Sequence, residues 1–154
     1  MIFGRQPQEY FNKKRIAELT GLTERQVQFY TEQGIVTPEI DPGEGRGSTR
    51  YYSDHNVAQF MIIKGLSDLG MTIGRIRPAI KDMKLDGVLK KYASDQGGPI
   101  FIKILKMADG KLTPSWSIID SAATRSILDA DQMKDIDVCI VINFSRIANA
   151  ADKK

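Results

Sequence analysis

The sequence contains one cysteine, Cys139, and one histidine, His55, and both shortages exclude whole classes of site. A single cysteine cannot form an intramolecular disulfide, and such scarcity of thiols is typical of a reducing compartment. The chain also cannot build the Cys/His clusters that hold structural zinc. Its carboxylates have no recognisable ligand spacing, so the sequence predicts neither a metal nor a cofactor.

Long apolar runs and a strong overall charge are absent as well. No apolar stretch approaches the roughly 20 residues needed to cross a bilayer. The N-terminal segment MIFGRQPQEYF lacks the uninterrupted apolar core of a signal peptide. We therefore expect a cytoplasmic protein without membrane contacts.

The formal net charge is only +3 in 154 residues and is spread along the chain, so any basic surface for nucleic acid has to be local.

The first half of the sequence does contain a pair of short helices joined by a tight turn. Asn12 is the expected N-cap of a helix that ends near Thr20, with Gly21 as its C-terminal stop. Thr23 and Gln26 have the spacing of a capping box, which predicts the start of the second helix.

The second helix is predicted to have two different faces. Val27 and Tyr30, three residues apart, are expected to point into the core. Arg25, Gln28 and Glu32 share the opposite side. A polar and charged outer face on the second helix of such a pair is typical of a helix that enters the major groove of DNA.

A loop or short hairpin follows between residues 37 and 52. Pro38, Pro42 and several glycines exclude a regular helix there. Arg46 and Arg50 are its only basic residues, and they are expected at the tip and at the exit of the loop.

Two more helices come after the loop. Ser53, with Asn56 three residues later, is the expected cap of a helix that stops at Gly70. Thr72 is the expected cap of the next helix, which Pro78 should kink or end. The longer helix has apolar residues at helical spacing that we assign to the core: Val57, Phe60, Ile63 and Leu66.

The pattern changes in the second half of the chain. Residues 81–95 resemble a weaker amphipathic helix, interrupted at Gly87, and Gln-Gly-Gly-Pro at residues 96–99 marks the clearest boundary. The predicted units are a mainly α winged helix-turn-helix domain at residues 10–82, a short helix and linker at 83–98, and a small α+β module at 99–148.

The α+β module is expected to contain three strands and a short helix. The predicted strands are 100–107, 112–119 and 138–144, with an Asp-Gly hairpin signal between the first two and a helix at 122–128. Cys139 is expected to be a small buried hydrophobe within the third strand. The expected core of the module, with a small-molecule pocket as the alternative, is Phe101, Met107, Trp116 and Phe144.

With these elements in place, residues 13–80 resemble the DNA-binding domain of the MerR family of bacterial transcription regulators. IAELTGLTERQVQFYTEQGIVTP, from residue 16, is similar to the first helix, turn and recognition helix of that family. RYYS, from residue 50, matches the arginine-x-tyrosine pair that ends the family's wing. IIKGLSDLGMTIGRI, from residue 62, matches the following helices.

Two features depart from the family pattern. Gln28 occupies the place where the family usually has an arginine, which removes one expected phosphate contact. The family also has a long helix that pairs antiparallel across a dimer, and Gly87 with residues 97–99 leaves little room for one.

The resemblance implies a sequence-specific regulator of transcription that binds double-stranded DNA as a homodimer at an inverted repeat in a promoter. RNA polymerase is considered as a further partner, and a small-molecule effector would be bound by the C-terminal module. In many family members the effector triggers untwisting of the promoter. Deforming the duplex costs free energy, and the contacts linked to the effector must offset that cost. The cysteine pairs of the metal-sensing members are absent here.

Several residues are candidates for contact with DNA. Arginine can pair with guanine and glutamine with adenine, so Arg25 and Gln26 in the first turn of the second helix are expected to read bases. Arg50 is expected to clamp a phosphate, with an ion pair to an acid such as Glu44 as the alternative. The full expected set is Lys13, Lys14, Thr23, Arg25, Gln26, Gln28, Tyr30, Arg46, Arg50 and Tyr52.

Each candidate also has an ordinary structural interpretation. Lysines at the start of a helix and polar residues on its outer face are usually just solvated. A tyrosine often buries its ring and keeps its hydroxyl at the edge of the core, and this applies to Tyr30 and Tyr52. We expect Tyr52 to contact a phosphate and Tyr30 to combine a core and a phosphate role.

Other classes of protein fit the sequence less well. An excisionase-like protein that bends DNA would use the same winged helix, but such proteins are usually shorter. A protein-interaction module with a docking winged helix is a second alternative. An enzyme is the weakest interpretation, because His55 is expected at the surface near a helix cap and GEGRG lacks the context of a phosphate-binding loop.

Overall fold

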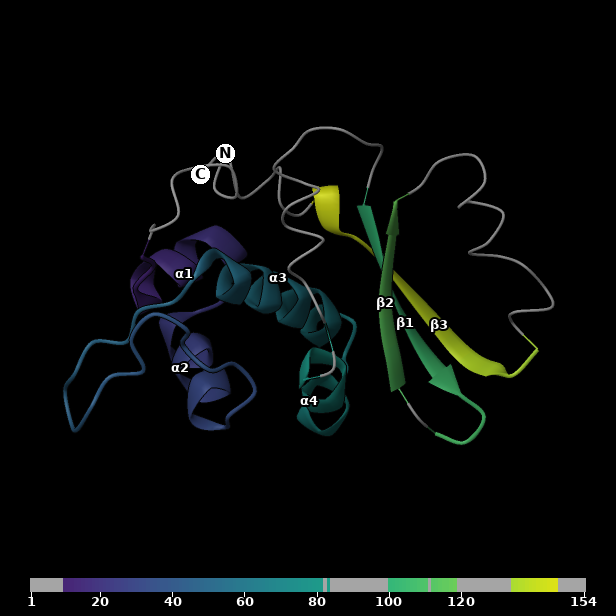
Figure 1. Cartoon of the computed structure of the whole chain (residues 1–154), viewed down its shortest axis with the longest axis horizontal. Coiled ribbons are helices and arrows are strands. Elements are labelled where there is room, and N and C mark those ends of the chain that lie inside the picture. Colours follow the sequence, from purple (N-terminus) through teal and green to yellow (C-terminus); the bar gives the residue numbers. More distant parts are fainter. Residues whose placement is uncertain (1–9, 82, 84–99, 111, 119–133, 147–154) are drawn as a thin grey trace.

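The computed structural model describes residues 10–81, 83, 100–110, 112–118 and 134–146. In this part of the chain, a group of helices is followed by a small antiparallel sheet that lies beside it (Figure 1). The helices are α1 (Lys13–Thr20), α2 (Glu24–Glu32), α3 (Asp54–Asp68) and α4 (Ile73–Lys81). The strands are β1 (Ile100–Met107), β2 (Leu112–Ile118) and β3 (Ile136–Asn143).

The ends of α1 and the start of α2 are fixed by local hydrogen bonds, as predicted. The Asn12 side chain accepts a hydrogen bond from the Arg15 backbone N–H at 2.9 Å. Gly21 ends α1 at φ 78°, a left-handed conformation that glycine adopts without steric cost. Thr23 and Gln26 form the complete capping box, which fixes the direction in which α2 leaves the turn.

The start of α3 is held by a buried amide. Ser53 and Asn56 form the predicted capping box, and Asn56 is fully buried. The Asn56 Oδ1 also accepts from the Glu39 backbone N–H at 3.0 Å, while its Nδ2 donates to the Thr37 carbonyl at 3.0 Å. One side chain therefore ties the segment after α2 to the beginning of α3. The predicted inner face of α3 is confirmed, since Val57, Phe60, Ile63 and Leu66 are fully buried.

Pro78 was predicted to kink or end α4, and the second alternative is wrong. The helix begins just after Thr72, as expected, but it continues past Pro78 to Lys81. A proline inside a helix removes one backbone hydrogen bond, and its ring crowds the preceding turn. Ala79 and Ile80, directly after the proline, are buried in the core, and this packing keeps the last turn helical.

The sheet has the order β2-β1-β3, and both pairings are antiparallel. The predicted hairpin is confirmed between β1 and β2, where Gly110 has φ 84°. β3 begins at Ile136, two residues before the predicted start, and ends at Asn143. The earlier start follows from continued pairing with β1, where Met107 lies opposite Ile136 after a shift in register.

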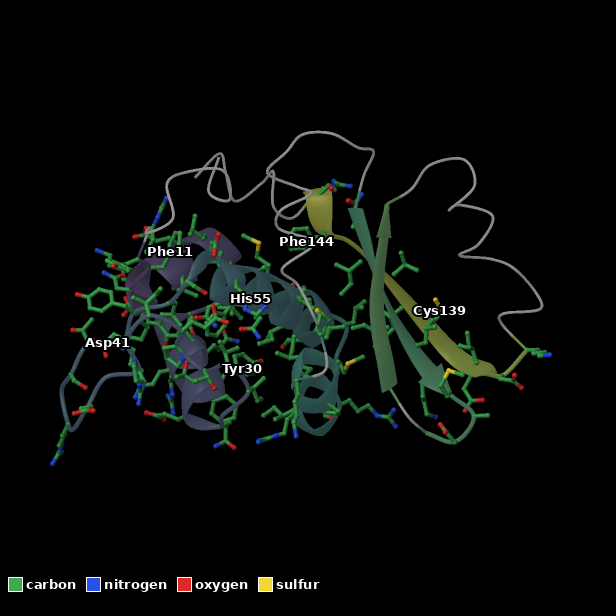
Figure 2. All side chains as sticks on the ribbon, viewed as in Figure 1. Phe11, Tyr30, Asp41, His55, Cys139 and Phe144 are labelled. Carbon is green, nitrogen blue, oxygen red and sulfur yellow. The ribbon has the colours of Figure 1, made fainter. Side chains whose placement is uncertain are left out.

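One face of the sheet packs against the helices. Ile104, Ile142 and Phe144 belong to the same buried cluster as the helical core. Phe144 points toward the helices, whereas Cys139 lies on the other side of the sheet (Figure 2). Cys139 is only half-buried, so its predicted burial is wrong, because side chains alternate along a strand and Ile140 and Ile142 take the core face.

The remaining predictions for the second half are only partly covered. Met107 is half-buried rather than fully enclosed. The side chains of Phe101 and Trp116, the predicted helix at 122–128, and the linker at 83–98 apart from Met83 lie outside the described residues. No helix in the described ranges is long and apolar enough to span a bilayer.

Candidate nucleic-acid interface

Helix α2 presents a polar face to solvent. Val27 and Tyr30 are buried on its inner side, as predicted. Arg25, Gln26 and Gln28 are exposed on its outer side. The Gln26 Oε1 accepts the hydrogen bond of the capping box at 2.8 Å, so the oxygen needed for a two-point contact with adenine is already engaged.

The segment after α2 forms a short hairpin, which we call the wing (residues 41–51). Asp41 and Tyr51 exchange backbone hydrogen bonds of 3.1 and 2.8 Å. Arg46 lies in the turn at the tip, flanked by glycines with positive φ. Arg50 lies at the exit, as predicted, and the wing projects beside α2 at the end of the molecule away from the sheet (Figure 1).

Gly43 allows a close approach inside the wing. It has φ 72°, and a Cβ atom there would lie 2.8 Å from the Ser48 Oγ and 3.1 Å from the Arg50 Cγ. The Asp41 carboxylate accepts a hydrogen bond from the Gly43 backbone N–H at 2.8 Å. The position of Arg50 therefore depends on a glycine seven residues earlier in the chain.

The wing is anchored to the core through Tyr52. Its ring is 1% exposed and packs edge-to-face on Phe60, with 5.5 Å between the centroids. Its hydroxyl lies 2.9 Å from the Thr31 Oγ1 on α2, and its backbone pairs with Phe11 just before α1. Burial raises the pKa of the Tyr52 hydroxyl. This burial argues against the expected phosphate contact and makes Tyr52 a link between the wing and α2.

A chain of polar contacts joins α1, α2 and the wing. The Lys13 Nζ donates to the Gln28 Oε1 at 3.3 Å, and the Gln28 Nε2 donates to the Glu32 Oε1 at 2.8 Å. The same Glu32 oxygen lies 4.0 Å from the Arg50 Nη1. Arg50 is thus paired with an acid, but with Glu32 on α2 rather than with Glu44 in the wing.

These side chains surround a groove of about 470 Å³ between α1, α2 and the wing, which we call the wing groove. Five of the expected DNA contacts line it: Lys13, Gln28, Arg46, Arg50 and Tyr52. The Ser48 and Thr49 side chains add hydroxyl groups that no sequence pattern singled out. The other expected contacts, Lys14, Thr23, Arg25, Gln26 and Tyr30, do not line the groove, and of these only Tyr30 is buried.

The model of the family described as "MerR HTH family regulatory protein" matches residues 12–82. The match covers just under half of the chain, and we call the matched segment the MerR-type domain. The match spans α1 to α4 and includes the wing, the groove and every expected DNA contact.

Part of the chain is also similar to curated mycobacterial proteins. The chain is 32% identical over 71 residues to an uncharacterised HTH-type transcriptional regulator of Mycobacterium bovis, and equally similar to one of Mycobacterium tuberculosis. The aligned segment is 46% of this chain and 32% of each relative. The chain therefore spans about a third of the length of the curated relatives it matches.

Charge is distributed unevenly over the MerR-type domain. Lys13 lies 3.9 Å from Glu24, and Arg50 is paired with Glu32. Within the described residues, Arg25 and Arg46 have no ion pair. Both arginines are exposed, and each is therefore available to an incoming polyanion.

Exposed aromatic side chains flank the same surface and were not expected from the sequence. Phe29 is 39% exposed on α2, and Tyr51 is 38% exposed on the wing. Tyr51 packs edge-to-face against Tyr10, with 6.3 Å between the ring centroids. Phe29 directly precedes the buried Tyr30 and is therefore out of phase with the inner face of α2.

Proposed function

We propose that this chain is a sequence-specific regulator of transcription that binds double-stranded DNA through α2 and the wing. The observation that carries the proposal is the wing groove, where polar and basic side chains from α1, α2 and the wing surround one hollow. DNA binding needs cations that hold phosphates and side chains that read base edges. The groove and the neighbouring turn of α2 supply both kinds.

The roles of the residues follow from their positions. Arg25 is in the first turn of α2, where recognition helices usually contact bases, and we assign it to base reading. Thr23 and Gln26 beside it form the capping box that holds this turn. Arg46 and Arg50 bind phosphates from the wing, and Lys13 and Lys14 bind the flanking backbone. Gln28 contributes a neutral polar contact next to Lys13. Tyr30 and Tyr52 hold α2 and the wing in position.

We further propose that the regulator acts as a homodimer on an inverted repeat within a promoter. A two-fold symmetric protein matches a palindromic site whose half-sites are separated by whole turns of the duplex. An effector site in the α+β module and contact with RNA polymerase stay predictions from the family resemblance.

Selection from a pool of random duplex DNA with the full-length protein tests this function. We expect enrichment of a sequence with two inverted half-sites, and no enrichment with a chain that carries Arg25→Ala and Arg50→Ala together. A single half-site would contradict the dimer and favour an architectural role. Equal recovery of all sequences at moderate salt would overturn sequence-specific recognition.

A further inference from the structure

A second hollow lies on a different side of the helical domain from the wing groove. It has a volume of about 470 Å³ and is lined by α4, the start of α3 and the segment after α2. The two hollows share no lining residue. We call this one the α4 hollow. Figure 2 labels one residue near each hollow: His55 lies toward α4, and Asp41 lies in the wing, farther from α4.

The α4 hollow contains a histidine that is held by a carboxylate. The His55 Nδ1 lies 2.6 Å from the Glu39 Oε1, and the Ser53 Oγ donates to the Glu39 Oε2 at 2.5 Å. His55 lies beside the cap of α3, as predicted, and its side chain is partly exposed, at 19%. Burial raises the pKa of Glu39, but the hydrogen bonds from Ser53 and His55 and the charge of His55 outweigh it and lower that pKa overall. An ionised Glu39 accepts the Nδ1 proton and fixes the orientation of the ring.

The other ring nitrogen of His55 has no partner. Its Nε2 atom is buried and forms no hydrogen bond within the described residues. Buried polar atoms in folded proteins are nearly always hydrogen-bonded, and an exception calls for an explanation such as a bound ligand. The residue that carries this atom lines the hollow.

The charged groups around the hollow favour an anion. Arg77 and Lys81 line it from the same face of α4, four residues apart. Within the described part of the chain, neither has an ion pair. The negative charge of Glu39 is already bound by Ser53 and His55. A net positive potential is therefore left in the hollow.

The rest of the lining is apolar. Ile35, Ile80 and Met83 contribute to the wall of the hollow, and all three are otherwise buried. A binding site with an apolar wall and a few convergent polar groups suits a small organic molecule better than an inorganic ion.

We propose that the α4 hollow binds a small organic anion that joins a carboxylate to a compact apolar body. The carboxylate accepts hydrogen bonds from the protonated His55 Nε2 and from the Lys81 or Arg77 side chain. The apolar body packs on Ile80 and Met83. This ligand site is separate from the proposed DNA contacts and lies in the helical domain rather than in the α+β module.

The position of the hollow couples the ligand to the recognition helix. The Arg77 Nη1 donates to the Gln33 carbonyl at the end of α2 at 2.8 Å. The Ile35 backbone N–H donates to the Tyr30 carbonyl in the last turn of α2 at 3.0 Å. A ligand that draws Arg77 toward itself competes with the Gln33 carbonyl and thereby acts on the end of the helix that presents Gln28 to DNA.

The test uses the full-length chain labelled with nitrogen-15, in which His55 is the only histidine. Sodium benzoate serves as the probe, and benzamide serves as a neutral control of the same size. We expect saturable binding of benzoate, with a saturable shift of the His55 ring-nitrogen resonances, and no saturable shift with benzamide. Lys81→Gln should weaken benzoate binding about tenfold or more, since hydrogen bonds to charged groups are among the stronger ones.

Arg75→Gln is the matched control, because Arg75 lies on α4 but does not line the hollow. It should leave benzoate affinity unchanged, and the amide spectra of both variants should show the native fold. Absence of saturation, equal shifts with benzamide, or equal losses in the two variants would overturn the proposal. None of these readouts involves DNA, so a failure here is distinguishable from a failure of the proposed regulator function.

Discussion

The Glu32 carboxylate lies 4.0 Å from the Arg50 guanidinium, across the gap between α2 and the wing. The acid steadies the arginine at the proposed DNA surface, but it also adds a negative charge that repels phosphates. Both groups line the wing groove and are partly exposed. In the proposed complex, a phosphate of DNA would replace Glu32 as the partner of Arg50, so the ion pair favours the unbound protein.

We expect Glu32→Gln to raise the affinity for duplex DNA of any sequence by about fivefold, the effect of roughly 1 kcal/mol of charge repulsion at an exposed site. Fluorescence anisotropy with a random duplex measures this gain. Glu18→Gln is the control, because Glu18 pairs with Arg15 on α1 and does not line the groove. Weaker binding by Glu32→Gln would mean that the acid positions Arg50 for the phosphate.

Arg50→Ala should weaken binding to all sequences. Loss of one phosphate contact lowers the slope of log affinity against log salt by about one. Titrations at several salt concentrations measure that slope. Lys106→Ala on β1 removes the same charge far from the groove and should leave the slope unchanged. If Arg50→Ala retained the wild-type slope, the wing would not contact phosphate.

Arg25→Ala should change sequence preference rather than overall affinity. A residue that reads a base relaxes discrimination at one position by roughly 1–3 kcal/mol. A series of duplexes with single base-pair changes in the selected site reveals that position. A uniform loss across the series would assign Arg25 to a phosphate instead.

Gly43→Ala should weaken DNA binding by distorting the wing. A Cβ atom at this position would lie 2.8 Å from the Ser48 Oγ and would press on Arg50, in addition to the strain of φ 72°. Gly45→Ala is a close control, because it has a similar φ of 79° and no atom within 4 Å of the added carbon. Backbone strain alone would reduce affinity equally in the two variants, whereas we expect the larger loss for Gly43→Ala.

The Glu39 pKa predicts how stability depends on pH. Its folded-state pKa lies below the usual 4.5, so ionised Glu39 stabilises the fold above that value, and the stabilisation is lost as the pH falls through the lower, folded pKa. Glu39→Gln should therefore destabilise the protein at neutral pH and do so much less in acid. Urea unfolding at both pH values measures the difference, which we expect to be modest because the carboxylate is 44% exposed. An equal loss at both pH values would show that charge is not involved.

Local signals explain which elements were predictable from the sequence. The caps at Asn12, Thr23 and Ser53 join residues three apart, and each was confirmed. The pairing of His55 with Glu39 joins residues 16 apart, and no local pattern reports such a contact. The continuation of α4 through Pro78 depends in the same way on tertiary packing, which overrode the local preference.

The candidate site shows the same difference between features that local sequence patterns predict and features that depend on tertiary packing. The basic residues of α2 and the wing were found from helix phase and loop composition. Their pairing with Glu32, the engagement of Gln26 in the cap and the burial of Tyr52 depend on how α2 meets the wing. Those relationships decide which candidates are free to bind, and they exist only in the folded chain.

Tyr52 ties the geometry of the proposed DNA-binding surface to the packing of the interior. Its ring rests on Phe60 while its hydroxyl reaches α2, so a change in volume at Phe60 tilts the wing relative to the recognition helix. Genetic screens for altered operator preference should then recover substitutions at buried positions that never meet a base. In this protein, selection for a new binding site and selection for a stable interior act on some of the same residues.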